Sequence, residues 1–204
     1  MIKKQTLERL LQGIPPLANP SVQLEQYSTP ADIGADVLFE ALSHGDIEGR
    51  KMLDLGCGNG MFAIGAAMLR SNTSVGVDLD PSALQQARKN ANDLGVNVEF
   101  VRADVGRFSA RADTVIMNPP FGAQNRGADR PFLLTAMSVA EVVYSIHMAE
   151  TEDFLLRTVR DSGFSVDFQK RYKFEIPHMF AFHTKTKKNV EVMLLCVRKL
   201  GDRR

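Results

Sequence analysis

The sequence predicts an α/β protein in which seven strands form a doubly wound, mostly parallel sheet. Short β-rich runs alternate with helical stretches along most of the chain, and such alternation is typical of parallel strands covered by helices on both faces. The last two β-type runs are long and leave no room for a crossover helix, so we expect a C-terminal antiparallel hairpin. The 204 residues are 44% hydrophobic, which suits one domain with a sizeable core.

Each parallel strand is expected where a short apolar run is bounded by turn residues. These runs are KMLDL (51–55), TSVGVD (73–78), NVEFV (97–101), DTVIM (113–117) and VVYSIH (142–147), of which the last could instead close the preceding helix. Helical patterns cover 61–70, 81–95 and 132–141, and the hairpin strands are expected over 164–176 and 189–200. Pro81 suits a first helical turn and Gly95 a helix stop.

Residues 1–20 have a charged, helix-patterned start and are expected to be an extension to a single domain over residues 21–204. The N-terminus has no apolar signal core, and no run approaches the ~20 apolar residues of a membrane span. The two cysteines, Cys57 and Cys196, predict neither a disulfide framework nor a zinc site. We therefore expect a cytoplasmic protein without a metal or a membrane partner, and His44, His147 and His178 as structural or surface residues.

The net charge of +1 conceals a division along the chain. Residues 1–168 carry 15 Lys and Arg against 21 Asp and Glu, whereas residues 169–204 carry 10 against 3. A basic patch of this kind suits a polyanion such as nucleic acid. A charge cluster at a chain end is also often a solvated surface, so charge alone leaves both interpretations open.

Three successive strand ends carry residues typical of a nucleoside pocket. LDLGCGNG (53–60) ends a strand and opens a helix with a glycine-rich turn, which lets backbone approach a ligand closely. Asp78 follows about 20 residues later, where a carboxylate can accept ribose hydroxyls. Asp104 can face an adenine amino group while Val105 offers a backbone donor. The alternative is a doubly wound fold whose strand-end acids bind nothing.

A fourth strand end carries Asn118, Pro119, Pro120 and Phe121. The prolines cannot continue a helix and donate no N–H to a sheet, so this tetrapeptide is a rigid break. A turn without a catalytic role is the alternative interpretation.

In this order, DLGCGNG, GVDLD, RADV and NPPF resemble the class I S-adenosylmethionine-dependent methyltransferases, whose fold is Rossmann-like. The resemblance implies S-adenosylmethionine as cofactor, with its methionine part at the glycine-rich turn, its ribose at Asp78 and its adenine at Asp104. A dehydrogenase would more naturally show G-x-G-x-x-G and no Asn-Pro-Pro element. The implied cofactor-binding residues of these motifs are Asp54, Gly56, Cys57, Gly58, Asn59, Gly60, Asp78, Leu79, Asp104, Val105 and Asn118.

The tetrapeptide suits methylation of an amine. An aromatic amine is a poor nucleophile because its lone pair is delocalised into the ring. The Asn118 side-chain oxygen and the Pro119 carbonyl can accept the two amine hydrogens and favour a pyramidal nitrogen. Pro120 helps to fix these acceptors, and Phe121 offers a face for stacking a base. Families that methylate adenine N6, guanine N2 and protein glutamine all use such a tetrapeptide, so by itself it leaves the substrate open.

Four longer blocks narrow the resemblance. LEQYSTP (24–30), VIMNPPFGAQNRGADRPFL (115–133), VYSIH (143–147) and FHTKTKKNVEV (182–192) resemble the small methyltransferase-like family that makes N6-methyladenosine in small-subunit ribosomal RNA of eukaryotes and archaea. The resemblance covers about residues 20–200 and identifies 122–132 as a substrate loop. It implies that Gln26, Tyr27 and Thr29 close over the cofactor. Helix capping at Thr29, just before Pro30, is the alternative.

The resemblance also gives the basic hairpin and the sheet edge expected roles. Cations and rings in the hairpin can neutralise phosphates and pack on bases, although its phenylalanines could simply pack the loop. The predicted RNA-binding residues are Phe121, Gly122, Phe180, His183, Lys185, Lys187 and Lys188. Strand 96–101 is expected at the open edge, where the resembled family adds a strand from a small zinc-binding activator protein. Glu99 and Arg102 could instead keep the edge of a monomer unpaired.

Together these features predict a single methyltransferase catalytic domain that methylates adenosine N6 in structured, small-subunit ribosomal RNA. The alternatives are methylation of a protein glutamine N5, for example in a translation factor, and methylation of guanine N2 in RNA. The alternative from another class is a non-catalytic RNA-binding scaffold.

Overall fold

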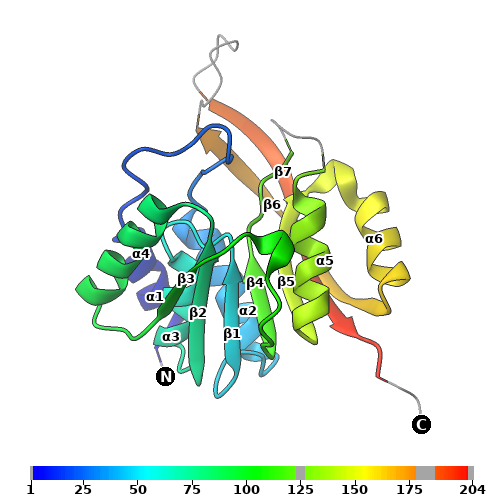
Figure 1. Cartoon of the computed structure of the whole chain (residues 1–204), viewed down its shortest axis with the longest axis horizontal. Coiled ribbons are helices and arrows are strands. Elements are labelled where there is room, and N and C mark those ends of the chain that lie inside the picture. Colours follow the sequence, from blue (N-terminus) through cyan, green and yellow to red (C-terminus); the bar gives the residue numbers. More distant parts are fainter. Residues whose placement is uncertain (1, 123–126, 178–186, 202–204) are drawn as a thin grey trace.

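Seven strands pair into one mixed sheet in the order β3-β2-β1-β4-β5-β7-β6 (Figure 1). This order is seen in the computed structural model, which describes residues 2–122, 127–177 and 187–201, and only the backbone of 174–177 and 187–189. The strands are β1 (Lys51–Leu55), β2 (Thr73–Asp78), β3 (Glu99–Arg102), β4 (Thr114–Met117), β5 (Val142–Met148), β6 (Phe164–Pro177) and β7 (Lys187–Lys199). The predicted fold class, a mostly parallel sheet with a C-terminal antiparallel hairpin, is confirmed.

Helices cover both faces of this sheet (Figure 1). The side chains of α1, α2 and α3 share a core with one face, and those of α5 and α6 share a core with the other. α4 packs against β2 and β3. The helices are α1 (Lys4–Gln12), α2 (Ala31–Ser43), α3 (Met61–Met68), α4 (Pro81–Asp93), α5 (Asp129–Val139) and α6 (Glu152–Asp161), with short 3-10 turns η1 (Val105–Arg107) and η2 (Ala149–Thr151).

Successive residues of the central strands belong to different cores, because side chains alternate across a sheet. Met52 and Ile116 pack toward α1, α2 and α3, while Leu53 and Val115 pack toward α5 and α6. Strands buried on both faces must be apolar throughout, which is why these runs lack a polar alternation. Asp54 places a carboxyl in such a strand, so core packing does not explain its presence there.

The hairpin strands β6 and β7 are antiparallel, and β7 lies between β5 and β6 although it is last in the sequence. Arg198 near the end of β7 pairs with Val142 at the start of β5. The last strand thus runs back to the amino edge of the parallel strands. The run 142–147 is a strand rather than the end of a helix, since it pairs with both β4 and β7.

Several elements depart from the sequence expectations; α5, for example, begins at Asp129 rather than at residue 132. β3 has four residues and starts at Glu99 rather than at residue 97, and α3 ends at Met68 rather than at residue 70. α6 was not predicted; its buried residues Leu155 and Val159 lie one turn apart and face the second core. α1 is anchored in the first core through Leu7 and Leu11, which have no exposed surface.

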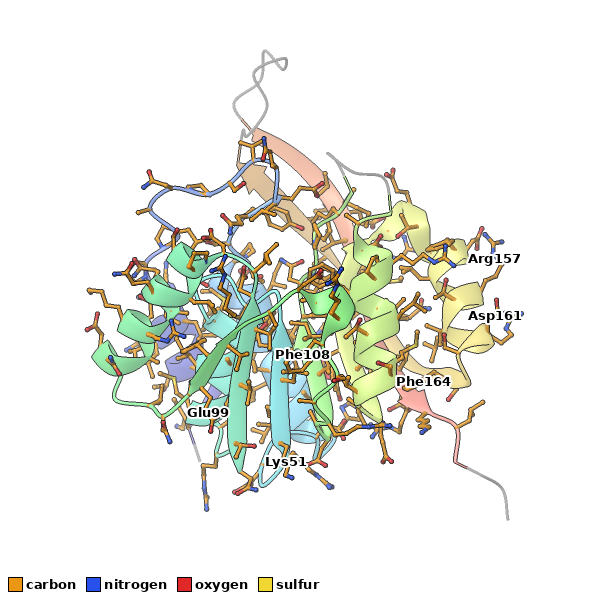
Figure 2. The ribbon with its side chains drawn as sticks, in the orientation of Figure 1. Lys51, Glu99, Phe108, Arg157, Asp161 and Phe164 are labelled. Atoms are coloured by element: carbon orange, nitrogen blue, oxygen red, sulfur yellow. The ribbon has the colours of Figure 1, made fainter. Side chains whose placement is uncertain are left out.

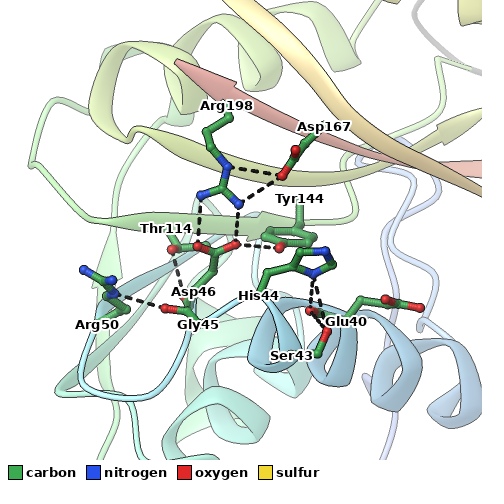
Figure 3. A network of polar contacts seen from close by, with 10 residues as sticks. All are labelled: Glu40, Ser43, His44, Gly45, Asp46, Arg50, Thr114, Tyr144, Asp167 and Arg198. Carbon is green, nitrogen blue, oxygen red and sulfur yellow. Dashed lines mark hydrogen bonds and ion pairs between the residues drawn. The ribbon is translucent and has the colours of Figure 1, made fainter. Parts of the chain in front are cut away.

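A buried polar network joins the loop after α2 to the amino edge of the sheet (Figure 3). Asp46 is 5% exposed and accepts two hydrogen bonds from the Arg198 guanidinium, at 3.1 and 2.9 Å. The Tyr144 hydroxyl donates to the same carboxylate at 2.7 Å, and the Thr114 hydroxyl donates to the Asp46 backbone carbonyl. Because these residues come from β4, β5 and β7, the network ties three strands to one loop.

The strand order reverses between β1 and β4, and in doubly wound sheets ligands bind at the carboxyl ends of the strands beside such a reversal. Lys51, at the start of β1, marks the amino edge at the bottom of Figure 2. The carboxyl ends lie at the opposite edge, beneath the segment that joins α1 to α2 (Figure 1). Within the described parts of the chain, no helix is both long enough and apolar enough to span a bilayer.

Candidate active site

A cavity of about 320 Å³ opens at the carboxyl edge of the sheet. Its walls come from the ends of β1, β2 and β4, from η1 and α5, and from residues 23–29. The predicted residues that line it are Gln26, Tyr27, Thr29, Asp54, Gly56, Cys57, Gly58, Asn59, Asp78, Leu79, Asp104, Val105, Asn118 and Pro120. Gly60, Pro119, Phe121 and Gly122 belong to the same turns but lie outside the lining.

The glycine-rich turn is shaped by backbone that other residues would strain. Gly56 has φ +71°, and a Cβ there would come within 2.9 Å of the Phe132 ring. Gly60, at φ +86°, would meet Ala87 of α4 and Phe100 of β3 at 3.1 Å, so its role is to let the turn before α3 pack closely against α4 and β3. Gly58 has open space around it, as a cradle for a ligand requires.

Two buried carboxylates stand in the cavity wall. Asp54 accepts the backbone N–H of Ala63 at 3.0 Å, and Asp78 accepts the N–H groups of Gly58 at 2.8 Å and Asp80 at 2.9 Å. Burial raises the pKa of Asp54 to about 8 against the lowering effect of the Ala63 N–H, and the charge of Asp78 raises it further. Burial likewise raises the pKa of Asp78. A cation or a set of hydroxyl donors would relieve the desolvation of both groups.

Of the remaining residues predicted to bind the cofactor, some line the cavity and others also stabilise its walls. Asp104 accepts the Gly106 N–H at 2.9 Å and so caps η1, while Leu79 is 50% exposed and offers an apolar wall. Asn59 donates to the Pro15 carbonyl at 3.2 Å, which ties the turn to the α1–α2 segment. Burial raises the pKa of the Cys57 thiol well above its usual value, so this thiol stays protonated.

Asn118 follows β4 and lines the cavity, and only one end of its side-chain amide has a hydrogen-bond partner. Its Nδ2 donates to the Thr29 hydroxyl oxygen at 3.0 Å. Its Oδ1 is buried and has no hydrogen-bond partner, a condition shared in the described residues only by Ser71 Oγ. Since buried polar atoms are nearly always paired, an unpaired acceptor on a residue that lines a cavity indicates a place for a donor from a ligand.

Residues 25–29 hold the tetrapeptide from outside. The Tyr27 hydroxyl donates to the Pro119 carbonyl at 3.1 Å, and the Tyr27 and Phe121 rings pack with centroids 4.9 Å apart. Glu25 accepts the Gly122 N–H at 3.0 Å. The capping alternative for Thr29 is wrong, because α2 has Pro30 as its N-cap without a side-chain capping bond.

The sequence analysis missed Glu25 and, among other lining residues, Met61 and Phe62, and it placed Phe132 in the substrate loop rather than at the cofactor cavity. Glu25 is only 7% exposed, and Phe132 of α5 covers the glycine-rich turn. A carboxyl in an exposed-looking segment and a phenylalanine in a helical pattern carry no local signal of such positions. Glu25 contacts Gly122, which lies 97 residues further along the chain, and a local motif cannot reveal such a contact.

The predicted RNA-binding residues are only partly described. Phe180, His183 and Lys185 lie outside the described residues, and Lys187 and Lys188 are described by backbone alone, opposite Pro177 and Ile176. Other cations of the hairpin are paired with acids: Lys170 with Asp36 and Glu40, Arg171 with Glu152 and Glu191, and Arg198 with Asp46 and Asp167. Part of the C-terminal excess of positive charge is therefore neutralised by the negative first part of the chain.

The two histidines that the structure describes, His44 and His147, do not belong to a metal-ligand set. The ring nitrogens of His147 contact Ser145 at 2.7 Å and Asp129 at 3.0 Å in the core, and His44 stacks on Phe168. Within residues 2–122, 127–177 and 187–201, no group of three or more His, Cys, Asp or Glu is placed to hold a metal ion. Chemically, the site is suited to a polar cationic ligand beside a buried acceptor for N–H groups.

Comparison with known proteins agrees with this geometry. Residues 27–139 match the family model of the methyltransferase small domain. The chain is 36% identical to the rRNA N(6)-adenosine-methyltransferase Mettl5 of Drosophila melanogaster, over 94% of each chain. It is 35% identical to an uncharacterised protein of Methanocaldococcus jannaschii, over 98% of this chain and 96% of that protein. A crystal structure from Pyrococcus horikoshii superposes with a TM-score of 0.92 at 38% identity, over 98% of this chain and 100% of the other.

Proposed function

Because this chain belongs to the methyltransferase small domain family, we propose that it transfers the methyl group of S-adenosylmethionine to the N6 amine of an adenosine in ribosomal RNA. The likeness to a named rRNA adenosine-N6 methyltransferase spans 94% of both chains, so it extends well beyond residue 139, where the family domain ends. Because the likeness extends beyond the cofactor-binding half of the chain, it supports a shared substrate as well as a shared reaction. The small subunit as the source of this RNA is part of the proposal.

The observation that carries the proposal is the unpaired Asn118 Oδ1 at the cavity wall. An adenine N6 amine has two N–H donors and a lone pair delocalised into the ring. Acceptance of one N–H by Asn118 Oδ1 and of the other by the Pro119 carbonyl would favour a pyramidal nitrogen with its lone pair free. Pro119 O already accepts from Tyr27, but a carbonyl has two lone pairs and can accept a second bond.

The cavity fits S-adenosylmethionine, which supplies an electrophilic methyl group on a positively charged sulfonium. The buried Asp54 and Asp78 match a cationic ligand with ribose hydroxyls, and Gly58 leaves room for close approach to the backbone. Asp54 and the glycine-rich turn would hold the methionine part, Asp78 the ribose, and Asp104 with Val105 the adenine. Gln26 reaches Asp80 at 2.9 Å and would help close the cavity.

Methyl transfer to nitrogen requires no titratable base at the moment of reaction. The nitrogen lone pair forms the new bond as the sulfur–methyl bond breaks, and positive charge moves from sulfur to nitrogen. Oxygens of Asn118 and Pro119 that face this nitrogen bind it more strongly as its charge grows, so they stabilise the transition state over the ground state. The extra proton then passes from nitrogen to water. Phe121 would stack on the base, and a paired adenine would first have to leave its helix.

The RNA surface and a protein partner complete the proposal. Phe121, Gly122 and the hairpin residues Phe180, His183, Lys185, Lys187 and Lys188 would contact RNA. β3 lies at the open edge of the sheet, and Val101 on it is 39% exposed, which suits strand addition by a small zinc-binding activator protein. We place the enzyme in the cytoplasm, with residues 1–20 as an extension of one catalytic domain over 21–204.

The test is transfer of labelled methyl from S-adenosylmethionine to purified small-subunit ribosomal RNA, with and without the zinc-binding partner, followed by nucleoside analysis. We expect N6-methyladenosine. N2-methylguanosine would overturn the choice of base, and label in a protein glutamine would overturn RNA as the substrate. If calorimetry detects cofactor binding but no methyl group reaches any of these substrates, the protein is a non-catalytic scaffold.

A further inference from the structure

Alternate residues of the segment 25–29, here called the clamp, contact successive parts of the catalytic tetrapeptide and the residue after it. Glu25 bonds to the Gly122 N–H, Tyr27 to the Pro119 carbonyl and the Phe121 ring, and Thr29 to the Asn118 amide. The contacts bridge 89 to 97 residues of sequence. They come from one short stretch, so a shift of this stretch would move all of the tetrapeptide contacts together.

With Nδ2 turned toward Thr29, the Asn118 amide has Oδ1 as its unpaired end. The Thr29 hydroxyl oxygen accepts from Nδ2 at 3.0 Å, which leaves Oδ1 without a partner. The two ends of an amide are nearly equal in size, and only hydrogen bonds distinguish them. With the opposite orientation the amide would present N–H donors to an amine that itself has donors, and the acceptor would be lost.

The Tyr27 contact fixes the second acceptor. Its hydroxyl donates to the Pro119 carbonyl at 3.1 Å while its ring packs on Phe121. Burial, together with the charges of Glu25 and Asp129, raises the pKa of Tyr27 well above its usual value, so the hydroxyl keeps the proton that it donates. Pro119 therefore has its carbonyl direction set by a group outside the tetrapeptide.

The backbone of the clamp carries strain that a mere linker would not need. Glu25 has φ +51°, in the left-handed region that non-glycine residues seldom adopt, and its carboxyl is buried. Such a conformation costs on the order of 1–3 kcal/mol and persists where the surroundings impose it. Its position beside the Gly122 N–H indicates that the clamp is held against the catalytic strand end.

We propose that Tyr27 and Thr29 are positioning residues for methyl transfer: Thr29 orients the Asn118 amide so that Oδ1 is the free acceptor, and Tyr27 fixes the Pro119 carbonyl. This inference rests on the proposed function. It differs from a purely cofactor-binding role, because it places the effect of each hydroxyl on the alignment of the substrate amine. Both residues also line the cavity, so the clamp joins the cofactor site to the two acceptors.

Removal of single hydroxyls tests the proposal. Tyr27→Phe and Thr29→Val are expected to lower kcat by roughly 10- to 100-fold, as slight misalignment of reacting groups does. The Kd for S-adenosylmethionine, measured by calorimetry, should stay within about threefold of the wild-type value, a change too small to account for the loss in kcat. Thr29→Ser keeps the acceptor oxygen and should restore kcat.

Matched controls separate alignment from stability. Tyr172→Phe removes a hydroxyl that donates to Asp36 at 2.7 Å, and Thr114→Val removes one that donates to Asp46 at 2.8 Å, both away from the cavity. These variants should keep wild-type kcat. If Tyr27→Phe or Thr29→Val loses cofactor affinity as much as it loses kcat, or keeps full kcat, the positioning role is overturned.

A second measurement does not depend on turnover. In ¹⁵N-labelled protein, the side-chain amide signals of Asn118 should shift in Thr29→Val and return in Thr29→Ser, and the Phe121 N–H signal should shift in Tyr27→Phe. Unchanged signals would overturn the positioning role whatever the enzyme methylates. Shifted signals in a protein that methylates no adenosine would overturn the proposed function and leave the alignment of Asn118 and Pro119 intact.

Discussion

A buried carbonyl oxygen without a hydrogen-bond partner costs a folded protein about 1–3 kcal/mol. Asn118 Oδ1 has this cost in the free protein, although a rotation of the amide about one bond would place Oδ1 next to Thr29 instead. A residue chosen for stability alone would not leave its acceptor unpaired at a cavity wall. The cost is recovered when a ligand donates to Oδ1, so this atom favours the substrate complex over the free protein.

Asn118→Ala is expected to abolish methyl transfer while the Kd for S-adenosylmethionine changes by less than about tenfold, or roughly 1.4 kcal/mol. The variant removes the unpaired oxygen, so its melting temperature should equal or exceed that of the wild type. Asn92→Ala, at an exposed position of α4, is the matched control and should retain activity. Loss of cofactor binding or of folding in Asn118→Ala would assign Asn118 to the scaffold rather than to the substrate.

The pKa of Asp54 predicts how pH affects the protein without cofactor. Its folded-state value of about 8 lies above the ordinary value of 3.8, so the folded state holds a proton that the unfolded state releases between these limits. The stability due to this proton is fully present below about pH 4 and is lost as pH rises through about 8. Asp54→Asn should therefore melt close to the wild type at pH 4 and above it at pH 9.

Thermal unfolding at both pH values checks this, with Asp93→Asn, an exposed carboxyl on α4, as the control. A difference between wild type and Asp54→Asn that does not change with pH would contradict the burial argument. The same reasoning predicts how pH affects cofactor affinity. A cationic cofactor favours the ionised carboxylate of Asp54, so S-adenosylmethionine should bind more tightly as pH rises toward about 8. Its binding at pH 7 should release protons.

At the scale of elements, strands and their ends are predicted well because their signals are local. Each parallel strand was recognised from its own apolar run, and many of the residues that line the cavity follow strand ends with turn chemistry that a short window reveals. α6 was missed because only Leu155 and Val159 mark its buried face. The clamp was assigned to the cofactor alone, since its contacts with Asn118 and Pro119 span about ninety residues and leave no periodic trace.

The network around Asp46 predicts how firmly the last strand is joined to the rest. Arg198→Ala leaves a nearly buried carboxylate with Tyr144 as its remaining side-chain donor. The Arg198 side chain is 37% exposed, so we expect a loss of about 2 kcal/mol, between the values for exposed and buried pairs. Asp167→Ala removes the exposed partner of the same guanidinium and should cost under about 1 kcal/mol. Equal losses in the free energy of unfolding of the two variants, measured by urea unfolding, would contradict this expectation.

At the scale of the whole molecule, the two oppositely charged parts of the chain fold against each other. Lys170 of β6 bonds to Asp36 and Glu40 of α2, which are separated from it by 134 and 130 residues. The sequence showed the charge imbalance but not this pairing, because an ion pair requires proximity that only the fold creates. The cations available to RNA are therefore fewer than a count along the sequence suggests.

This pairing predicts which lysines and arginines determine the salt dependence of RNA binding. Each phosphate contact contributes about 0.7–0.9 to the slope of log affinity against log salt. Replacing Lys185, Lys187 and Lys188 with Ala should reduce this slope by about 2–3, whereas Arg171→Ala should leave it unchanged because Arg171 pairs with Glu152 and Glu191. Filter binding at several salt concentrations measures both slopes. Equal slopes in wild type and the triple variant would place the phosphates elsewhere.

The position of β7 between β5 and β6 has a consequence for synthesis of the chain. Residues emerge from the ribosome in order, so β5 and β6 are complete before their shared neighbour exists. Until residues 187–199 appear, β5 has one unpaired edge, and its core residues Val143 and Ile146 lack their neighbours Val197 and Leu194 on β7. Such an incomplete sheet is prone to aggregate or to be held by chaperones. The nascent protein thus reaches a protected native state only when its final thirteen-residue strand is inserted.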